Sequence, residues 1–74
     1  MGTATLGLHV GTVASFDVDA GLGEVAADDG SRFAFHCTAI AGGPRTIEPG
    51  ARVAFRVGAG GPGRWEAFEV TPAG

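Results

Sequence analysis

The segment Arg52–Val57, with the sequence RVAFRV, alternates strictly between large apolar side chains and arginine or alanine. This two-residue period places Val53, Phe55 and Val57 on one face of a β-strand, and it does not fit the 3.6-residue period of an amphipathic helix. A strand of this kind needs partner strands and an apolar core beneath it. The rest of the chain is therefore expected to supply further strands.

Short apolar, β-branched or alternating segments elsewhere in the chain predict more strands. They are Leu8–Phe16, Leu22–Ala26, Arg32–His36 and Trp65–Thr71. In the third predicted strand, Phe33 and Phe35 are expected to face the core and His36 to face outward. For the last strand, the alternation predicts that Phe68 and Val70 face the core. The same alternation places Trp65, Ala67 and Glu69 on the outer face.

The connections between these segments carry turn-forming residues. Asp17–Gly21 and Asp28–Gly30 are predicted turns, because aspartate and glycine supply the backbone conformations that tight turns require. Cys37–Ile40 is long enough for one helical turn, Ala41–Gly50 is the longest irregular connection, and Gly58–Gly63 is predicted to be a flexible loop. Glycine accounts for 14 of the 74 residues, which disfavours long helices because each costs about 1 kcal/mol in a helix interior.

A chain of 74 residues has room for one small domain. Met1–Gly7 is predicted to be a flexible arm, and residues 8–74 to form the folded domain. Two flat sheets would leave unpaired strand edges that so short a chain cannot cover, so the strands are expected to close into a small all-β barrel.

The charge balance is acidic, with five arginines, no lysine and eight acidic residues, for a net charge of -3. This balance does not favour phosphate binding. The single cysteine, Cys37, excludes an internal disulfide. With no secretion signal and no apolar run near the ~20 residues of a membrane helix, we expect a cytoplasmic protein without membrane contact.

Catalytic and metal sites are not predicted. His9, His36 and Cys37 lack the spacing of metal ligands. Ser15, Asp17 and His36 include the residue types of a hydrolytic triad, but the sequence has no nucleophile elbow and the chain is too small to shield such a site. We therefore expect no enzyme, no cofactor and no small-molecule substrate.

Several motifs, taken in order, resemble the cold-shock domain family, and in particular bacterial cold-shock-like proteins. They are GTVASFD at 11–17, GLG at 21–23, DG at 29–30, FAFHCTAI at 33–40 and RTIEPGARVAF at 45–55. The resemblance covers about residues 8–71. It implies a five-stranded antiparallel Greek-key barrel of the OB-fold type, which binds single-stranded RNA or DNA by stacking bases on aromatic side chains.

The chain departs from the family pattern at that stacking surface. Small, aliphatic or charged residues replace the family's aromatic residues at Ser15, Leu22, Glu24, Ala34, Cys37 and Pro44. Ala14 and Ala20 replace its lysines. Phe16, His36 and Arg45 are retained. Loss of about five aromatic residues, each contributing at least ~1 kcal/mol, predicts binding weaker by several orders of magnitude.

Two functions follow as hypotheses. The first is weak binding of single-stranded RNA or DNA through Phe16, Leu22, His36, Arg45, Arg64 and Trp65. In the second, the substituted surface serves protein interaction or self-association, such as a homodimer, because its apolar residues suit a protein interface. Alternatively, Trp65 is an anchor that covers the barrel edge. The arginines, in turn, are alternatively ion-pair partners of Glu66 or Glu69.

Overall fold

The structure is a computed structural model that describes residues 8–43, 46–61 and 63–73. The predicted arm at 1–7 and the predicted site residue Arg45 lie outside these ranges. The elements are β1 (Leu8–Asp17), β2 (Leu22–Ala27), β3 (Arg32–His36), the 3-10 helix η2 (Cys37–Ala39), β4 (Arg52–Gly61) and β5 (Arg64–Pro72). Within the described ranges no helix is long and apolar enough to cross a membrane.

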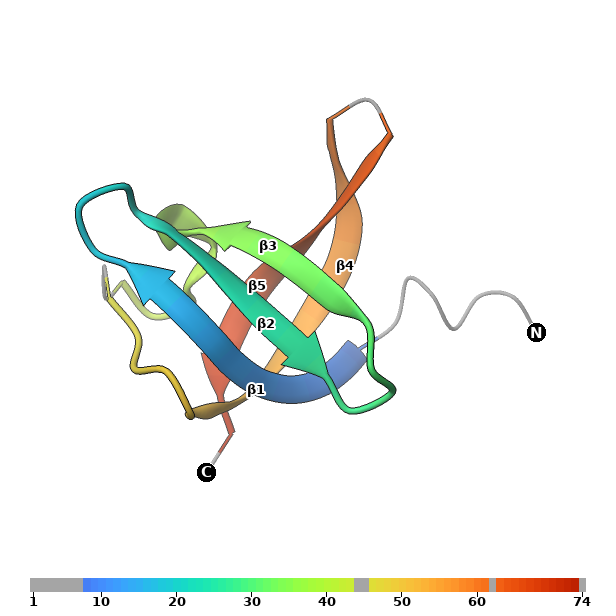
Figure 1. Cartoon of the computed structure of the whole chain (residues 1–74), viewed down its shortest axis with the longest axis horizontal. Coiled ribbons are helices and arrows are strands. Elements are labelled where there is room, and N and C mark those ends of the chain that lie inside the picture. The colour runs from blue at the N-terminus through green and yellow to red at the C-terminus, as the bar shows by residue number, and fades with distance from the viewer. Residues whose placement is uncertain (1–7, 44–45, 62, 74) are drawn as a thin grey trace.

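The strands form a closed barrel in the order β1-β2-β3-β5-β4 (Figure 1). All neighbouring strands are antiparallel except β3 and β5, which meet through a parallel pairing of Ala34 with Glu66 that closes the barrel. The predicted all-β, five-stranded barrel of the OB-fold type is confirmed.

Strand β1 is long enough to pair on both sides, and Gly11 lies where its two partners meet. Gly11 is opposite Ala27 of β2 and also opposite Val53 of β4. A Cβ atom at this position would overlap the carbonyl oxygen of Ala26, so the strands can approach this closely only because residue 11 is glycine. The glycine therefore lets one strand join the two halves of the barrel.

The inward side chains form one apolar core. The buried residues are Val13, Val25, Ala27, Phe35, Ile40, Val53, Phe55, Val57, Ala67 and Val70. The predicted inward set of β4 is confirmed, and Phe55 is fully buried. Phe33 is half-buried and packs against this core, as its alternation with Phe35 predicts. No buried polar side chain is found among the described residues.

The predicted facing of β5 is wrong at two positions. Ala67 is buried at 1% exposure, whereas Phe68 is 38% exposed. Arg56 of β4 pairs with Phe68 and Ala54 pairs with Thr71, so β5 has one extra residue between these pairs. Glu69 in this segment has a φ of 51°, a bulge conformation that interrupts the alternation. Ala67 and Val70 therefore both reach the core, although they are three residues apart in the sequence.

The predicted flexible loop at Gly58–Gly63 is also wrong over most of its length. Strand β4 continues to Gly61, and β5 begins at Arg64. The ends of the two strands form a hairpin arm that extends past the barrel at the top of Figure 1. The glycine composition suggested a loop, but the arm is held by pairing of Gly58 with Glu66 and of Ala59 with Trp65.

Candidate nucleic-acid interface

The outward side chains of β1, β2 and β3 form the surface where the family resemblance predicts binding. We call this surface the platform face, and its residues are Ser15, Leu22, Glu24, Ala34 and His36. Cross-strand pairing aligns Ser15, Glu24, Ala34 and then Glu66 of β5 in one row. Glu24 therefore places a carboxylate in the central row of this face, and no aromatic ring lies there. The carboxyl group of Glu66 packs against Gly60 of β4 instead.

Glu24 also engages the nearest arginine. Arg32 Nη1 donates a hydrogen bond of 2.8 Å to Glu24 Oε1, and the two side chains are 58% and 41% exposed. An exposed ion pair of this kind contributes at most about 1 kcal/mol to stability. Its consequence for binding is larger, because a phosphate group that approaches Arg32 must compete with a carboxylate already bound to it.

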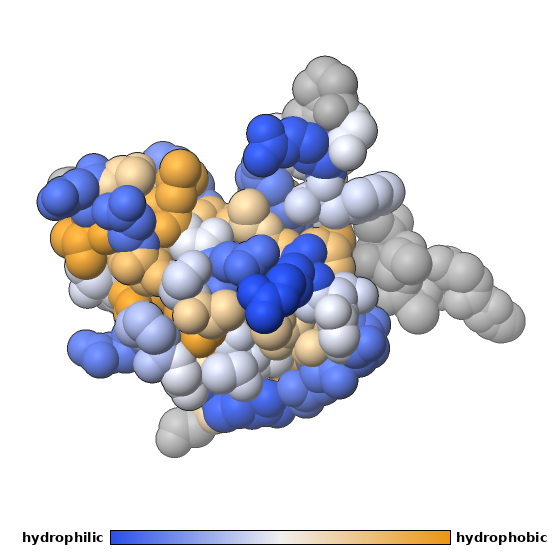
Figure 2. Space-filling model, viewed as in Figure 1, coloured by the Kyte–Doolittle hydropathy of each residue, from blue (hydrophilic) through white to orange (hydrophobic). Residues whose placement is uncertain are grey.

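Hydrophilic side chains cover the middle of the platform face, over β2 and β3, in the view of Figure 2. Hydrophobic side chains gather toward the turn between β1 and β2. Two exposed apolar residues lie in that region, Val18 at 65% exposure and Leu22 at 52%. The face is therefore divided, with a charged centre and an apolar end.

His36 lies at the apolar end, beside Leu22. The two residues are cross-strand partners, and both are exposed as predicted. His36 Nδ1 accepts a hydrogen bond of 3.3 Å from the backbone N–H of Thr38, and it lies 3.1 Å from Thr38 Oγ1. Since Nδ1 is an acceptor, the neutral ring carries its proton on Nε2. The capping interaction therefore holds the imidazole in one orientation, next to an aliphatic side chain.

Phe16, a predicted site residue, belongs to the other side of the sheet. It is half-buried, and its ring stacks on Phe35 with a centroid distance of 5.9 Å and an interplanar angle of 19°. Gly23 lies between them, and a Cβ atom there would come within 2.8 Å of the Phe16 ring. Because Phe16 packs against the core, the structure does not bring it together with His36.

Trp65 is 57% exposed but lies on the inner side of β5. It shares that side with the buried Ala67, two residues further on, and it remains exposed because it belongs to the arm beyond the barrel. The predicted outward facing is therefore wrong for Ala67, for the register reason given above, whereas Trp65 is exposed as predicted. The structure therefore separates Trp65 from His36, and the alternation places Arg64 on the outer side of the arm with Glu66.

Three of the arginines are in ion pairs with acidic residues. Besides Arg32 with Glu24, Arg56 Nε binds Glu69 Oε1 at 2.8 Å, as one of the sequence alternatives predicted. Arg52 binds Asp28 through two hydrogen bonds of 2.7 and 2.9 Å. The hydrogen bonds and the positive charge of Arg52 hold the pKa of the Asp28 carboxyl below its usual value. Among the described arginines, only Arg64 has no ion pair.

The turn acids have the structural role that the sequence predicted. Asp17 Oδ1 accepts hydrogen bonds from the backbone N–H groups of Asp19 and Ala20, and Asp29 Oδ1 accepts one from Ser31. In the described part of the chain, no group of three or more histidine, cysteine or acidic side chains is arranged to hold a metal ion.

Comparison with known proteins agrees with this architecture. The family model described as the 'Cold-shock' DNA-binding domain matches residues 9–73. A solved structure described as "drosophila Unr CSD456" superposes with a TM-score of 0.78 at 23% sequence identity, over 99% of this chain and 29% of that one. The chain thus spans less than a third of that structure. No curated protein matches the chain. The chain belongs to the cold-shock domain family, which consists of nucleic-acid-binding domains rather than enzymes.

Proposed function

We propose that this protein binds single-stranded RNA or DNA weakly, at the Leu22–His36 end of the platform face. The observation that carries the proposal is the exposed imidazole of His36, held in place by Thr38 beside the exposed Leu22. An aromatic ring and an adjacent aliphatic side chain offer one base a surface for stacking. Family membership supports nucleic acid as the class of ligand.

The charged centre of the same face is the physical reason for weak binding. The row of Ser15, Glu24 and Ala34 offers no ring to a second or third base, and the Glu24 carboxylate repels the phosphate backbone. Each missing stacked base costs about 1–3 kcal/mol. A single stacking position therefore limits both affinity and sequence preference.

Few cations are available for phosphate contacts. Arg32 is bound to Glu24, and Arg52 and Arg56 are paired elsewhere on the barrel. Arg64 lies on the arm, on the same side of β5 as Glu66. Since the salt dependence of binding grows with the number of phosphates neutralised, we expect the affinity to fall only slightly as salt is raised.

The test is a fluorescence-anisotropy titration of a dye-labelled heptameric oligo-dT at low salt, with wild-type protein and two His36 variants. His36→Asn keeps an oxygen that can accept the Thr38 hydrogen bond but removes the ring, whereas His36→Phe keeps a ring and removes the acceptor. We expect His36→Asn to abolish binding and His36→Phe to retain it. Absence of wild-type binding at ~100 μM protein would refute the proposal.

A protein-interaction or self-association role is the second candidate, and one observation favours it. The pairing of three arginines removes most of the described positive charge, while Leu22 and Ala34 stay exposed on the platform face. Light scattering at rising protein concentration separates the candidates. A dimer that leaves Leu22 unprotected from solvent, or a strict monomer that binds oligo-dT, contradicts the second.

A further inference from the structure

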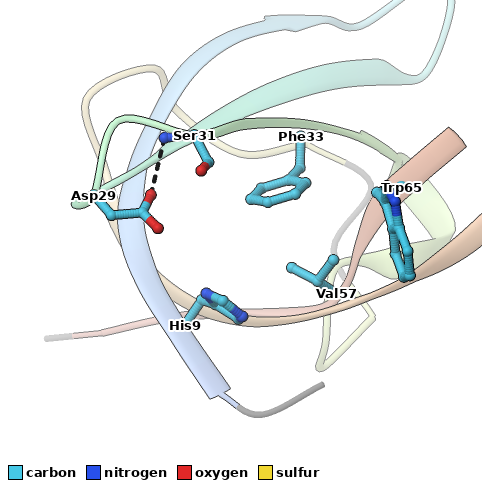
Figure 3. Close-up of a pocket in the computed structure, with 6 residues that line it drawn as sticks. All are labelled: His9, Asp29, Ser31, Phe33, Val57 and Trp65. Carbon is cyan, nitrogen blue, oxygen red and sulfur yellow. Dashed lines mark hydrogen bonds between the residues drawn. The ribbon is translucent and has the colours of Figure 1, made fainter. Parts of the chain in front are cut away.

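A pocket of about 310 Å³ opens at one end of the barrel (Figure 3). Its lining residues are His9, Asp29, Ser31, Phe33, Val57 and Trp65. They come from β1, the β2–β3 turn, β3, β4 and the arm portion of β5. The pocket is independent of the proposed function, because none of these residues belongs to the Leu22–His36 end of the platform face.

The floor of the pocket is rigid and aromatic. The His9 ring stacks on Phe55 at 5.7 Å and 18°, and Phe33 packs at a tilt against both rings, at 6.2 and 6.0 Å. Val57 completes this floor from β4. These contacts fix the rings by packing against the core, so the pocket does not depend on an induced rearrangement.

One side of the pocket is anionic. Asp29 and Ser31 lie opposite Trp65 in Figure 3, with Phe33 and Val57 between them. The backbone N–H and the hydroxyl of Ser31 hydrogen-bond the Asp29 carboxylate and hold its pKa below the usual value, so this group is ionised at neutral pH. Asp29 makes no ion pair with a described arginine, and a weaker charge interaction with His9, which also lines the pocket, contributes to its lowered pKa.

The aromatic floor and the anionic side together favour some classes of ligand over others. A nucleotide would bring a phosphate toward the Asp29 carboxylate, and no described arginine lines the pocket to offset the repulsion. A positively charged head on an apolar stem fits each part of the lining. The head binds the carboxylate and the Ser31 hydroxyl, and the stem packs between the aromatic floor and the Trp65 ring.

We propose that this pocket binds an organic cation, a guanidinium or ammonium group on an aliphatic stem, as carried by an arginine or lysine side chain. The Asp29 carboxylate receives the charged head, and Phe33, Val57 and Trp65 enclose the stem. Because a ligand of this size has few atoms, we expect a dissociation constant in the millimolar range for the isolated side-chain analogue.

Trp65 is the only tryptophan, so its fluorescence reports directly on the pocket. The full-length protein is titrated with N-acetyl-arginine amide and with N-acetyl-citrulline amide, its uncharged isostere. Backbone amide NMR shifts of Asp29 and Ser31 give a second readout in case the fluorescence change is small. We expect saturable binding of the arginine compound and roughly fivefold weaker binding of the citrulline compound.

Two variants identify the charged group responsible. Asp29→Asn keeps an oxygen to accept the Ser31 hydrogen bond, and it is expected to reduce arginine-amide affinity to the citrulline level. Asp19→Asn is the matched control, because Asp19 lies in the turn between β1 and β2, outside the pocket. This variant is expected to leave the arginine-amide affinity unchanged. A blocked Gly-Gly-Arg-Gly-Gly peptide that binds tighter than the amide indicates a protein partner, and equal binding indicates a free cation.

Three results would overturn the proposal. They are equal binding of the charged and neutral compounds, no saturable response in either readout, and unchanged affinity in folded Asp29→Asn protein. Saturable binding of cytidine that Asp29→Asn leaves unchanged would assign the pocket to a nucleobase instead. Oligo-dT binding at His36 is measured separately, so the failure of one proposal does not affect the other.

Discussion

Restoring aromatic rings to the centre of the platform face should convert a weak binder into a strong one. The change is the double variant Glu24→Phe with Ala34→Phe. Both positions point outward and are direct cross-strand partners, so the two rings would lie side by side on the surface. The same change removes the carboxylate that binds Arg32 and leaves this arginine available for phosphate.

The expected gain can be estimated from the structure. Each ring provides a stacking position worth about 1–3 kcal/mol, so two rings contribute at least ~2 kcal/mol, which corresponds to at least about a 30-fold increase in affinity. The cost to the fold is small. Loss of an exposed ion pair costs at most about 1 kcal/mol, and a cross-strand aromatic pair returns about 0.2–1 kcal/mol.

The assay is the same anisotropy titration with labelled oligo-dT at low salt. The matched control is Glu24→Leu with Ala34→Leu, which makes the same change in charge and a similar change in polarity without adding rings. We expect this control to bind less than about fivefold tighter than wild type. If the folded double-phenylalanine variant binds no tighter than the double-leucine control, the platform face is not the binding surface and the reasoning fails.

Three further predictions concern the barrel itself. Phe55→Ala should lower the free energy of unfolding by about 3–5 kcal/mol in urea titrations, because Phe55 is fully buried, and a loss below about 1 kcal/mol would contradict the described core. The pKa of Asp28 is lowered in the folded state by its hydrogen bonds to Arg52, so the stability that this pair contributes is present above the unfolded pKa near 4 and is lost as the pH falls through the folded pKa. Asp28→Asn should therefore unfold more readily than wild type at pH 7 and become equal to it in strong acid, and a constant difference in melting temperature would be inconsistent with this pair. Glu69→Gly, made in an Arg56→Ala background so that no ion pair is lost, should raise stability by about 1 kcal/mol because a residue with a φ of 51° is strained unless it is glycine, and a lower melting temperature would refute the strained bulge.

The sequence predicts the strands and their core-facing side chains correctly where the two-residue alternation is uninterrupted. In β4, the inward positions Val53 and Val57 follow from side-chain period alone. In β5, the period is interrupted at Glu69, and no feature of the sequence marks a glutamate as the bulge residue. The bulge depends on the registers of β4 and β5, which only the three-dimensional pairing defines.

In the candidate site, too, features set by local sequence were predictable, whereas features set by strand pairing were not. The exposed His36 and its neighbour Leu22 were predictable, because both lie on regular strands and match a family motif. The Glu24–Arg32 pair was not, because the two residues are eight apart in sequence and meet only through strand pairing. Trp65 was predicted to be exposed, but its side of the sheet depends on the arm, whose glycines suggested a loop.

The most direct test of the central claim, a cold-shock barrel that binds single-stranded nucleic acid at the Leu22–His36 end of its platform face, is an NMR titration. Uniformly ¹⁵N-labelled protein is titrated with unlabelled heptameric oligo-dT at low salt, and amide shift changes are mapped onto the barrel. We predict saturable changes centred on Leu22, His36 and Thr38, with a dissociation constant weaker than about 10 μM. The account is contradicted if no amide resonance changes position, or if the changes are confined to the pocket around Asp29 and Trp65.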